Sequence, residues 1–191
     1  MDAAHHDPFD TTIHEPPFDA TEVDHLLFSV ERSRAQFAWK VGGLGTDDLH
    51  RRSVPTSTMT LGGLLKHLAL CEDHFTADFL RGEPRPEPWR SVAGSAWAWG
   101  WESSLTDDAD DLYALWSASV SRARAAWREA IGDGGLDQPT ALVLDDGSRP
   151  TLRRALLDLS DEYARHVGHA DLLREAIDGL VGEDPPQHQI V

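Results

Sequence analysis

The chain has one cysteine, Cys71, among its 191 residues. A single cysteine excludes an internal disulfide and fits a reducing compartment. No apolar run approaches the roughly 18 residues that a membrane-spanning helix needs, and no basic segment followed by an apolar one begins the sequence. We therefore expect a cytoplasmic protein with no membrane partner and no targeting segment.

Basic residues are also few: 17 lysines and arginines stand against 33 acidic residues, and the formal net charge is -16. Proteins that bind nucleic acid place a basic face against the phosphates, and no Lys/Arg cluster offsets the acidic excess here. A nucleic-acid partner is therefore not expected. We interpret the acidic excess as a solvated surface.

Apolar residues recur at spacings of three and four in four long segments, a pattern typical of amphipathic helices. The predicted helices cover about residues 21–41, 59–81, 107–131 and 150–178. They predict an all-α four-helix bundle with long crossover connections over residues 20–180, between a flexible N-terminal arm (1–19) and a flexible C-terminal tail (181–191). Residues 141–147 are a candidate for one short β-hairpin before the last helix, because an apolar run leads there into Asp146-Gly147.

The connection over residues 82–105 is long for a compact domain, and such loops are disproportionately functional. It contains Trp97, Trp99 and Trp101 at alternate positions. This spacing predicts a short extended segment with three rings on one side. The rings either receive a substrate or pack under the loop.

Polar residues interrupt the apolar stripe of the last predicted helix. Glu162, His166 and His169 follow one another at spacings of four and three, so their side chains share one helix face. The apolar members of that stripe are Leu152, Ala155, Leu159, Leu173 and Ala176. An unpaired buried charge is costly, so these groups need partners. A metal ion is one such partner, and pairing among the three side chains is the other.

A further ligand would come from the second helix, since bundles build metal sites from facing helices. His67, Cys71 and His74 share one face of that helix. His67 is the strongest candidate, because its neighbours are apolar apart from Lys66. A buried cysteine is more often a small core residue than a ligand, and His74 fits the edge of the core.

Residues 60–68 (TLGGLLKHL) and 162–179 (EYARHVGHADLLREAIDG) resemble the two signature segments of the DinB/YfiT-like superfamily. The resemblance is strongest to an actinobacterial branch close to mycothiol-dependent maleylpyruvate isomerases, and it spans about residues 20–180. It implies a bundle that binds one divalent metal, zinc or nickel, through His67, Glu162 and His166. His169 is then a fourth ligand or a nearby catalytic base.

Two imidazoles and one carboxylate leave a position open on zinc, as in catalytic sites. We therefore predict a metal-dependent enzyme that activates water or a low-molecular-weight thiol such as mycothiol, for transfer to or isomerisation of a small-molecule substrate. Trp97, Trp99 and Arg165 are candidate cofactor-binding residues, although Arg165 has Asp158 and Asp161 as alternative partners. The alternative function is a non-catalytic, stress-associated metal-binding or scaffold protein. Aromatic residues on the bundle surface would also favour a homodimer.

Overall fold

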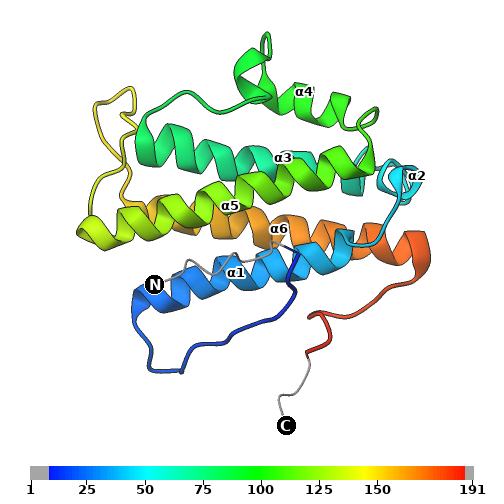
Figure 1. Cartoon of the computed structure of the whole chain (residues 1–191), viewed down its shortest axis with the longest axis horizontal. Coiled ribbons are helices and arrows are strands. Elements are labelled where there is room, and N and C mark those ends of the chain that lie inside the picture. Colours follow the sequence, from blue (N-terminus) through cyan, green and yellow to red (C-terminus); the bar gives the residue numbers. More distant parts are fainter. Residues whose placement is uncertain (1–8, 188–191) are drawn as a thin grey trace.

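The structure is a computed structural model, and it describes residues 9–187. Four long helical stretches form an all-α bundle, as predicted (Figure 1). In chain order the elements are α1 (Glu22–Val41), α2 (Thr46–Leu49), α3 (Leu61–Asp73), the π-helix η1 (His74–Arg81), the short 3-10 helix η2 (Trp89–Ser91), α4 (Ala96–Ser103), α5 (Ala109–Gly134) and α6 (Leu152–Asp178). In the described part of the chain, no helix is long and apolar enough to cross a membrane.

Threonines set the starting points of three of the long helices. Thr21 forms a capping box with Asp24 at the start of α1, and the side chain of Thr60 accepts a hydrogen bond from the backbone N–H of Gly63 at the start of α3. Thr151 caps α6 in the same way, so this helix begins at Leu152 and Pro150 lies before it. Each cap satisfies a backbone N–H that the helix leaves without an internal partner.

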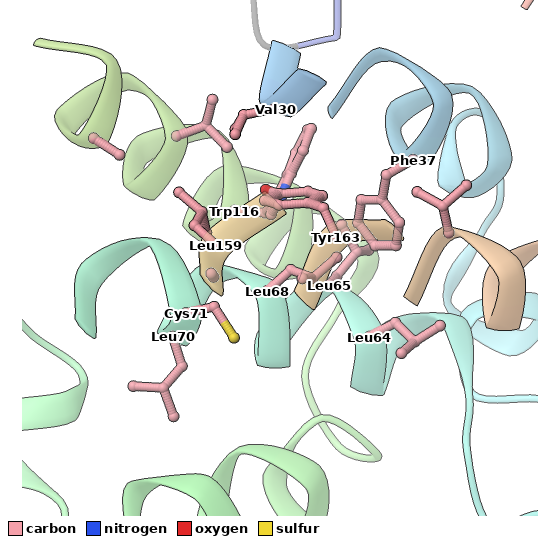
Figure 2. Packing of buried hydrophobic residues seen from close by; sticks show 14 of the residues in the cluster. Val30, Phe37, Leu64, Leu65, Leu68, Leu70, Cys71, Trp116, Leu159 and Tyr163 are labelled. Carbon is pink, nitrogen blue, oxygen red and sulfur yellow. The ribbon is translucent and has the colours of Figure 1, made fainter. Parts of the chain in front are cut away.

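The long helices pack mainly as two pairs, α1 with α6 and α3 with α5, while α4 lies across α3 (Figure 1). Large apolar side chains from all four long helices meet between them. Phe37, Leu65, Leu68, Trp116 and Tyr163 are fully or almost fully buried there (Figure 2). This core fixes the relative positions of α3 and α6, the two helices that carry the predicted ligands.

The tryptophan segment differs from its prediction, because it forms the helix α4 and not an extended strand. The Ser95 side chain accepts a hydrogen bond from the Ala98 backbone N–H and so starts a helical turn. In a helix, Trp97 and Trp101 share a face and Trp99 points elsewhere. The three rings therefore do not form the single row that the alternating spacing suggested.

The predicted β-hairpin forms a turn but no β-strands among the described residues. Residues 9–187 contain no β-strand beyond one isolated antiparallel bridge between Pro139 and Thr151. A turn follows the apolar run, and the Leu144 backbone N–H donates to the Ser148 carbonyl across it (2.9 Å). The backbone N–H groups of Ala141 and Leu142 are directed at η1 instead, and both donate to the Phe79 carbonyl (2.6 and 3.3 Å).

The described parts of both flanking segments are docked on the bundle. The Ile13 backbone N–H donates to the Gln187 side chain (2.8 Å), and Arg32 of α1 pairs with Asp184 (2.7 Å). The sequence predicts a flexible or loosely docked arm and a flexible tail, and these contacts involve the described residues of both. Residues 1–8 and 188–191, which belong to the same two predictions, lie outside the described residues.

Candidate metal centre

Three predicted ligands converge between α3 and α6. His67 Nε2 lies 3.4 Å from Glu162 Oε2, and His166 Nε2 lies 3.4 Å from the same oxygen. One donor atom of each residue lies within 4.8 Å of the other two. The two α6 residues are four positions apart and therefore one turn apart, while the fully buried leucines flanking His67 fix the facing side of α3.

Both imidazoles of this triad are held in the neutral form near neutral pH. Burial lowers the pKa of His67, and the hydrogen bond that its ring can donate to the Glu162 carboxylate only partly opposes this effect. Burial also lowers the pKa of His166, to about 4, and the nearby His67 ring adds to the shift. Neutral imidazole is the form that ligates a metal. A metal entering here would therefore displace few protons from the histidines.

Aromatic rings from α4 enclose His67. The Trp101 ring stacks on the His67 ring, with centroids 5.3 Å apart and an interplanar angle of 22°, and the Trp97 ring lies 5.6 Å away. Gly63 permits this approach, because a Cβ at that position would lie 2.6 Å from the Trp101 ring. A Cβ at Gly62 would lie 3.1 Å from the Leu49 carbonyl oxygen and from the Leu112 side chain, so each glycine of this weak helix sequence is explained by close packing against a different neighbour.

His169 contacts the far side of the triad. Its Nδ1 lies 3.2 Å from Nδ1 of His166, the ring nitrogen that faces away from Glu162. If His166 Nε2 binds a metal, its Nδ1 carries the hydrogen and donates it to His169. The geometry therefore places His169 behind a ligand rather than among the three converging donor atoms.

Cys71 lies beside His67, whereas His74 lies outside the triad. Cys71 Sγ lies 3.5 Å from His67 Nε2, and burial raises the pKa of its thiol well above the usual value. A protonated thiol is a poor nucleophile, whereas a metal held beside it would favour the thiolate. His74 is paired through Nδ1 with Asp78 at 2.6 Å, so it lies outside the group of three.

Trp99 and Arg165, two of the predicted cofactor-binding residues, point away from the triad. The Trp99 ring lies 4.1 Å from the Lys66 ammonium group and packs edge-on against Trp89. The Arg165 side chain is 62% exposed and pairs with Asp161, the intrahelical alternative weighed from the sequence. Trp97 and Trp101 are the tryptophans that line the triad.

A buried network of polar side chains lies close to the triad, and no sequence pattern predicted it. Arg34 of α1 binds Glu72 of α3 through two hydrogen bonds of 2.8 and 2.6 Å. Tyr163 of α6 donates to the same carboxylate (2.6 Å) and accepts from Trp116 Nε1 (3.0 Å). Tyr163 follows Glu162 directly and Glu72 lies five residues after His67, so the network fixes α3 against α6 close to the triad.

Comparisons with known proteins give one family match and two similar folds. The mycothiol-S-transferase family model matches residues 25–179. The crystal structure of a conserved protein from Enterococcus faecalis superposes with a TM-score of 0.62 at 14% identity, covering 84% of this chain and 99% of that one. The mycothiol-dependent maleylpyruvate isomerase superposes with a TM-score of 0.55 at 19% identity, covering 89% of this chain and 64% of that one. These superpositions show a shared fold. No curated protein sequence matches the chain significantly.

Proposed function

Because the chain belongs to the mycothiol-S-transferase family, we propose that it is a divalent-metal-dependent enzyme that activates mycothiol, or a similar thiol, for transfer to or isomerisation of a small substrate. The family assignment agrees with the resemblance inferred from residues 60–68 and 162–179 and points to mycothiol-related chemistry. The observation that carries the metal part of the proposal is the convergence of His67, Glu162 and His166 donor atoms within 4.8 Å.

Two of the three separations between these donors fit a tetrahedral ion. Ligands about 2.1 Å from a tetrahedral centre lie roughly 3.4 Å from one another. Both imidazole nitrogens lie 3.4 Å from the Glu162 oxygen. Two nitrogens and one oxygen suit zinc, with nickel as the second candidate, and three protein ligands leave a position open. A divalent ion held there would stabilise a thiolate at neutral pH.

The surrounding residues have distinct proposed tasks. His169 accepts the hydrogen of His166 Nδ1 and so keeps the opposite nitrogen directed at the site, which makes it a positioning residue in place of the base considered from the sequence. Trp97 and Trp101 cover His67 and exclude water from it. Burial raises the pKa of the Cys71 thiol, so we assign the reacting sulfur to the bound thiol and not to the protein.

The proposal also includes a cellular compartment and an oligomeric state. A cytoplasmic location is consistent with the single, reduced cysteine. A homodimer is supported by exposed apolar side chains such as Leu157 and Leu172, which are 45% and 61% exposed on α6. Size-exclusion chromatography with light scattering would test the dimer independently of the chemistry.

The central test is metal analysis of the purified protein and two variants. We expect about one zinc per chain in the wild type, loss of most of it in His67→Ala, and retention in His25→Ala, a matched change on α1 outside the site. The metal-loaded wild type should then be stabilised against heat by mycothiol, and His67→Ala should not. Full metal content in His67→Ala would show that the ligand set is wrong. Metal binding without stabilisation by any thiol would remove the thiol from the proposal.

A further inference from the structure

Polar side chains gather beyond the metal triad, next to His74 at the start of η1. His74 lies seven positions after His67, which is two helical turns or about 10 Å along the helix. The Trp97 ring of α4 contacts both imidazoles, with its centroid 5.6 Å from that of His67 and 5.4 Å from that of His74. A ligand of about 10 Å held at the triad by one end can therefore reach His74 with the other.

Asp78 of η1 connects these side chains. His74 Nδ1 lies 2.6 Å from Asp78 Oδ2, and Arg85 donates to the same oxygen through Nε (2.9 Å) and Nη2 (2.6 Å). Gly82 ends η1 in the left-handed conformation (φ 61°) and turns the chain, so that Arg85 returns to Asp78. The Arg85 guanidinium also lies 5.8 Å from the centre of the Trp97 ring. We call His74, Asp78 and Arg85 the η1 cluster.

Three polar atoms of the η1 cluster are available to a ligand. His74 Nε2, Asp78 Oδ1 and Arg85 Nη1 have no hydrogen-bond partner among residues 9–187. None of them is among the unpaired polar atoms that the fold buries, so each reaches solvent. About one quarter of each of the three side chains is exposed. Since all three groups meet at one carboxylate oxygen, a single ligand can contact more than one of them.

The hydrogen-bonding capacity of the η1 cluster suits hydroxyl groups. Burial raises the pKa of Asp78, but the hydrogen bonds from His74 and Arg85 outweigh it and lower this pKa, so the carboxylate is ionised. Within the cluster the charges of Asp78 and Arg85 cancel. In the neutral His74 ring Nδ1 donates to Asp78 and Nε2 is an acceptor. The three available atoms are then two acceptors and one donor, and neighbouring hydroxyl groups, which both donate and accept, match them.

We propose that the η1 cluster binds the hydroxyl groups of an uncharged ring in the thiol whose sulfur lies at the triad. The inference rests on the proposed function, which places that sulfur beside His67. It selects among thiols, because the preferred one carries a sugar-like or cyclitol-like ring about 10 Å from its sulfur. Mycothiol has such rings attached to an N-acetylcysteine arm, whereas glutathione ends in carboxylates and an ammonium group. π-Helical segments often accompany functional sites, and η1 directly follows the helix that carries His67.

The affinities of the zinc-loaded protein for three thiols, measured by isothermal titration calorimetry, provide the test. Mycothiol and N-acetylcysteine share the thiol-bearing arm and differ in the hydroxylated rings. We expect the wild type to bind mycothiol at least about tenfold more tightly than N-acetylcysteine or glutathione. Asp78→Ala removes one acceptor and releases His74 and Arg85, so it should weaken mycothiol binding about tenfold and leave N-acetylcysteine binding unchanged. Arg85→Gln should act in the same direction and serves if Asp78→Ala does not fold.

Arg81→Gln provides the matched control, because Arg81 lies on η1 but pairs with Glu129 outside the cluster. Its affinity for mycothiol should equal that of the wild type. Three results would overturn the inference and leave the proposed function intact: equal or tighter wild-type binding of N-acetylcysteine or glutathione, wild-type affinity for mycothiol in Asp78→Ala, or equal weakening of mycothiol and N-acetylcysteine in that variant. Binding of no thiol by the wild type would remove the inference together with the thiol part of the proposed function.

Discussion

Replacing Glu72 by glutamine should destabilise the protein far more than the same kind of change at a surface ion pair. The Glu72 side chain is fully buried and that of Arg34 is 4% exposed, and two hydrogen bonds of 2.8 and 2.6 Å join them. Glutamine keeps the shape and one acceptor for Tyr163 but removes the charge. Arg34 then stays buried with only Glu31 to balance it.

The expected loss of unfolding free energy in Glu72→Gln follows from this partial compensation of the Arg34 charge. Removing one partner of a buried ion pair typically costs about 3–5 kcal/mol. Because Arg34 retains Glu31 and the amide oxygen still accepts hydrogen bonds, we expect about 2–4 kcal/mol for Glu72→Gln. For a chain of this length that corresponds to a fall in Tm of roughly 5–15 °C.

Asp158→Asn provides the matched control. Asp158 pairs with Arg154 at 2.8 Å on the surface of α6, where the two side chains are 36% and 69% exposed. An exposed pair contributes about 0–1 kcal/mol. Urea denaturation of the wild type and both variants, with equal m values confirmed, gives the two free-energy differences. If Glu72→Gln lowers the free energy of unfolding no more than Asp158→Asn does, burial does not make the Arg34–Glu72 pair more stabilising than an exposed pair, and the reasoning is refuted.

Three further changes test other parts of the structure. Gly63→Ala would place a Cβ 2.6 Å from the Trp101 ring, so it should displace α4 and cost about 1–3 kcal/mol in thermal denaturation; an unchanged Tm would contradict the close packing. His169→Phe removes the acceptor behind His166 and should weaken zinc binding about 10–100-fold by isothermal titration calorimetry, and unchanged affinity would remove its positioning role. Burial raises the pKa of Glu31, but two neighbouring guanidinium groups outweigh it and lower this pKa from 4.5 to about 2. The resulting stabilisation is complete above about pH 4.5 and is lost as the pH falls towards 2, so Glu31→Gln should flatten the acid limb of a plot of urea midpoint against pH.

The candidate ligands stand out in the sequence against an apolar background, and the family resemblance selects His67, Glu162 and His166 among them. Glu162 and His166 interrupt a stripe that otherwise reads as core, and His67 does the same on a second helix. Helical periodicity gives the direction of each side chain, and the bundle architecture then requires facing helices to share a site. The structure brings the three residues together as this reasoning expects, while the identity of the ion depends on the metal analysis.

Other features of the structure could not be predicted from the sequence. Trp97, Trp99 and Trp101 alternate as they would in a strand, yet local capping by Ser95 and packing against Gly63 produce a helix. The periodicity of three rings over five residues is too short to distinguish the two. Arg34 and Glu72 are 38 positions apart, and nothing in either local sequence indicates the partner. Ion pairs between distant helices depend on rotation and register that periodicity does not specify.

The docking of the two flanking segments brings distant parts of the chain together: Ile13 and Gln187 are 174 positions apart in sequence and are joined by a 2.8 Å hydrogen bond. A short linker between these segments, with the chain reopened in the exposed turn at residues 145–148, would yield a circular permutant. In that permutant α6 would directly precede α1, its principal packing partner. The α1–α6 interface, the largest between helices, would then join two helices that are neighbours in sequence instead of the first and the last. This change lowers the relative contact order and should accelerate folding.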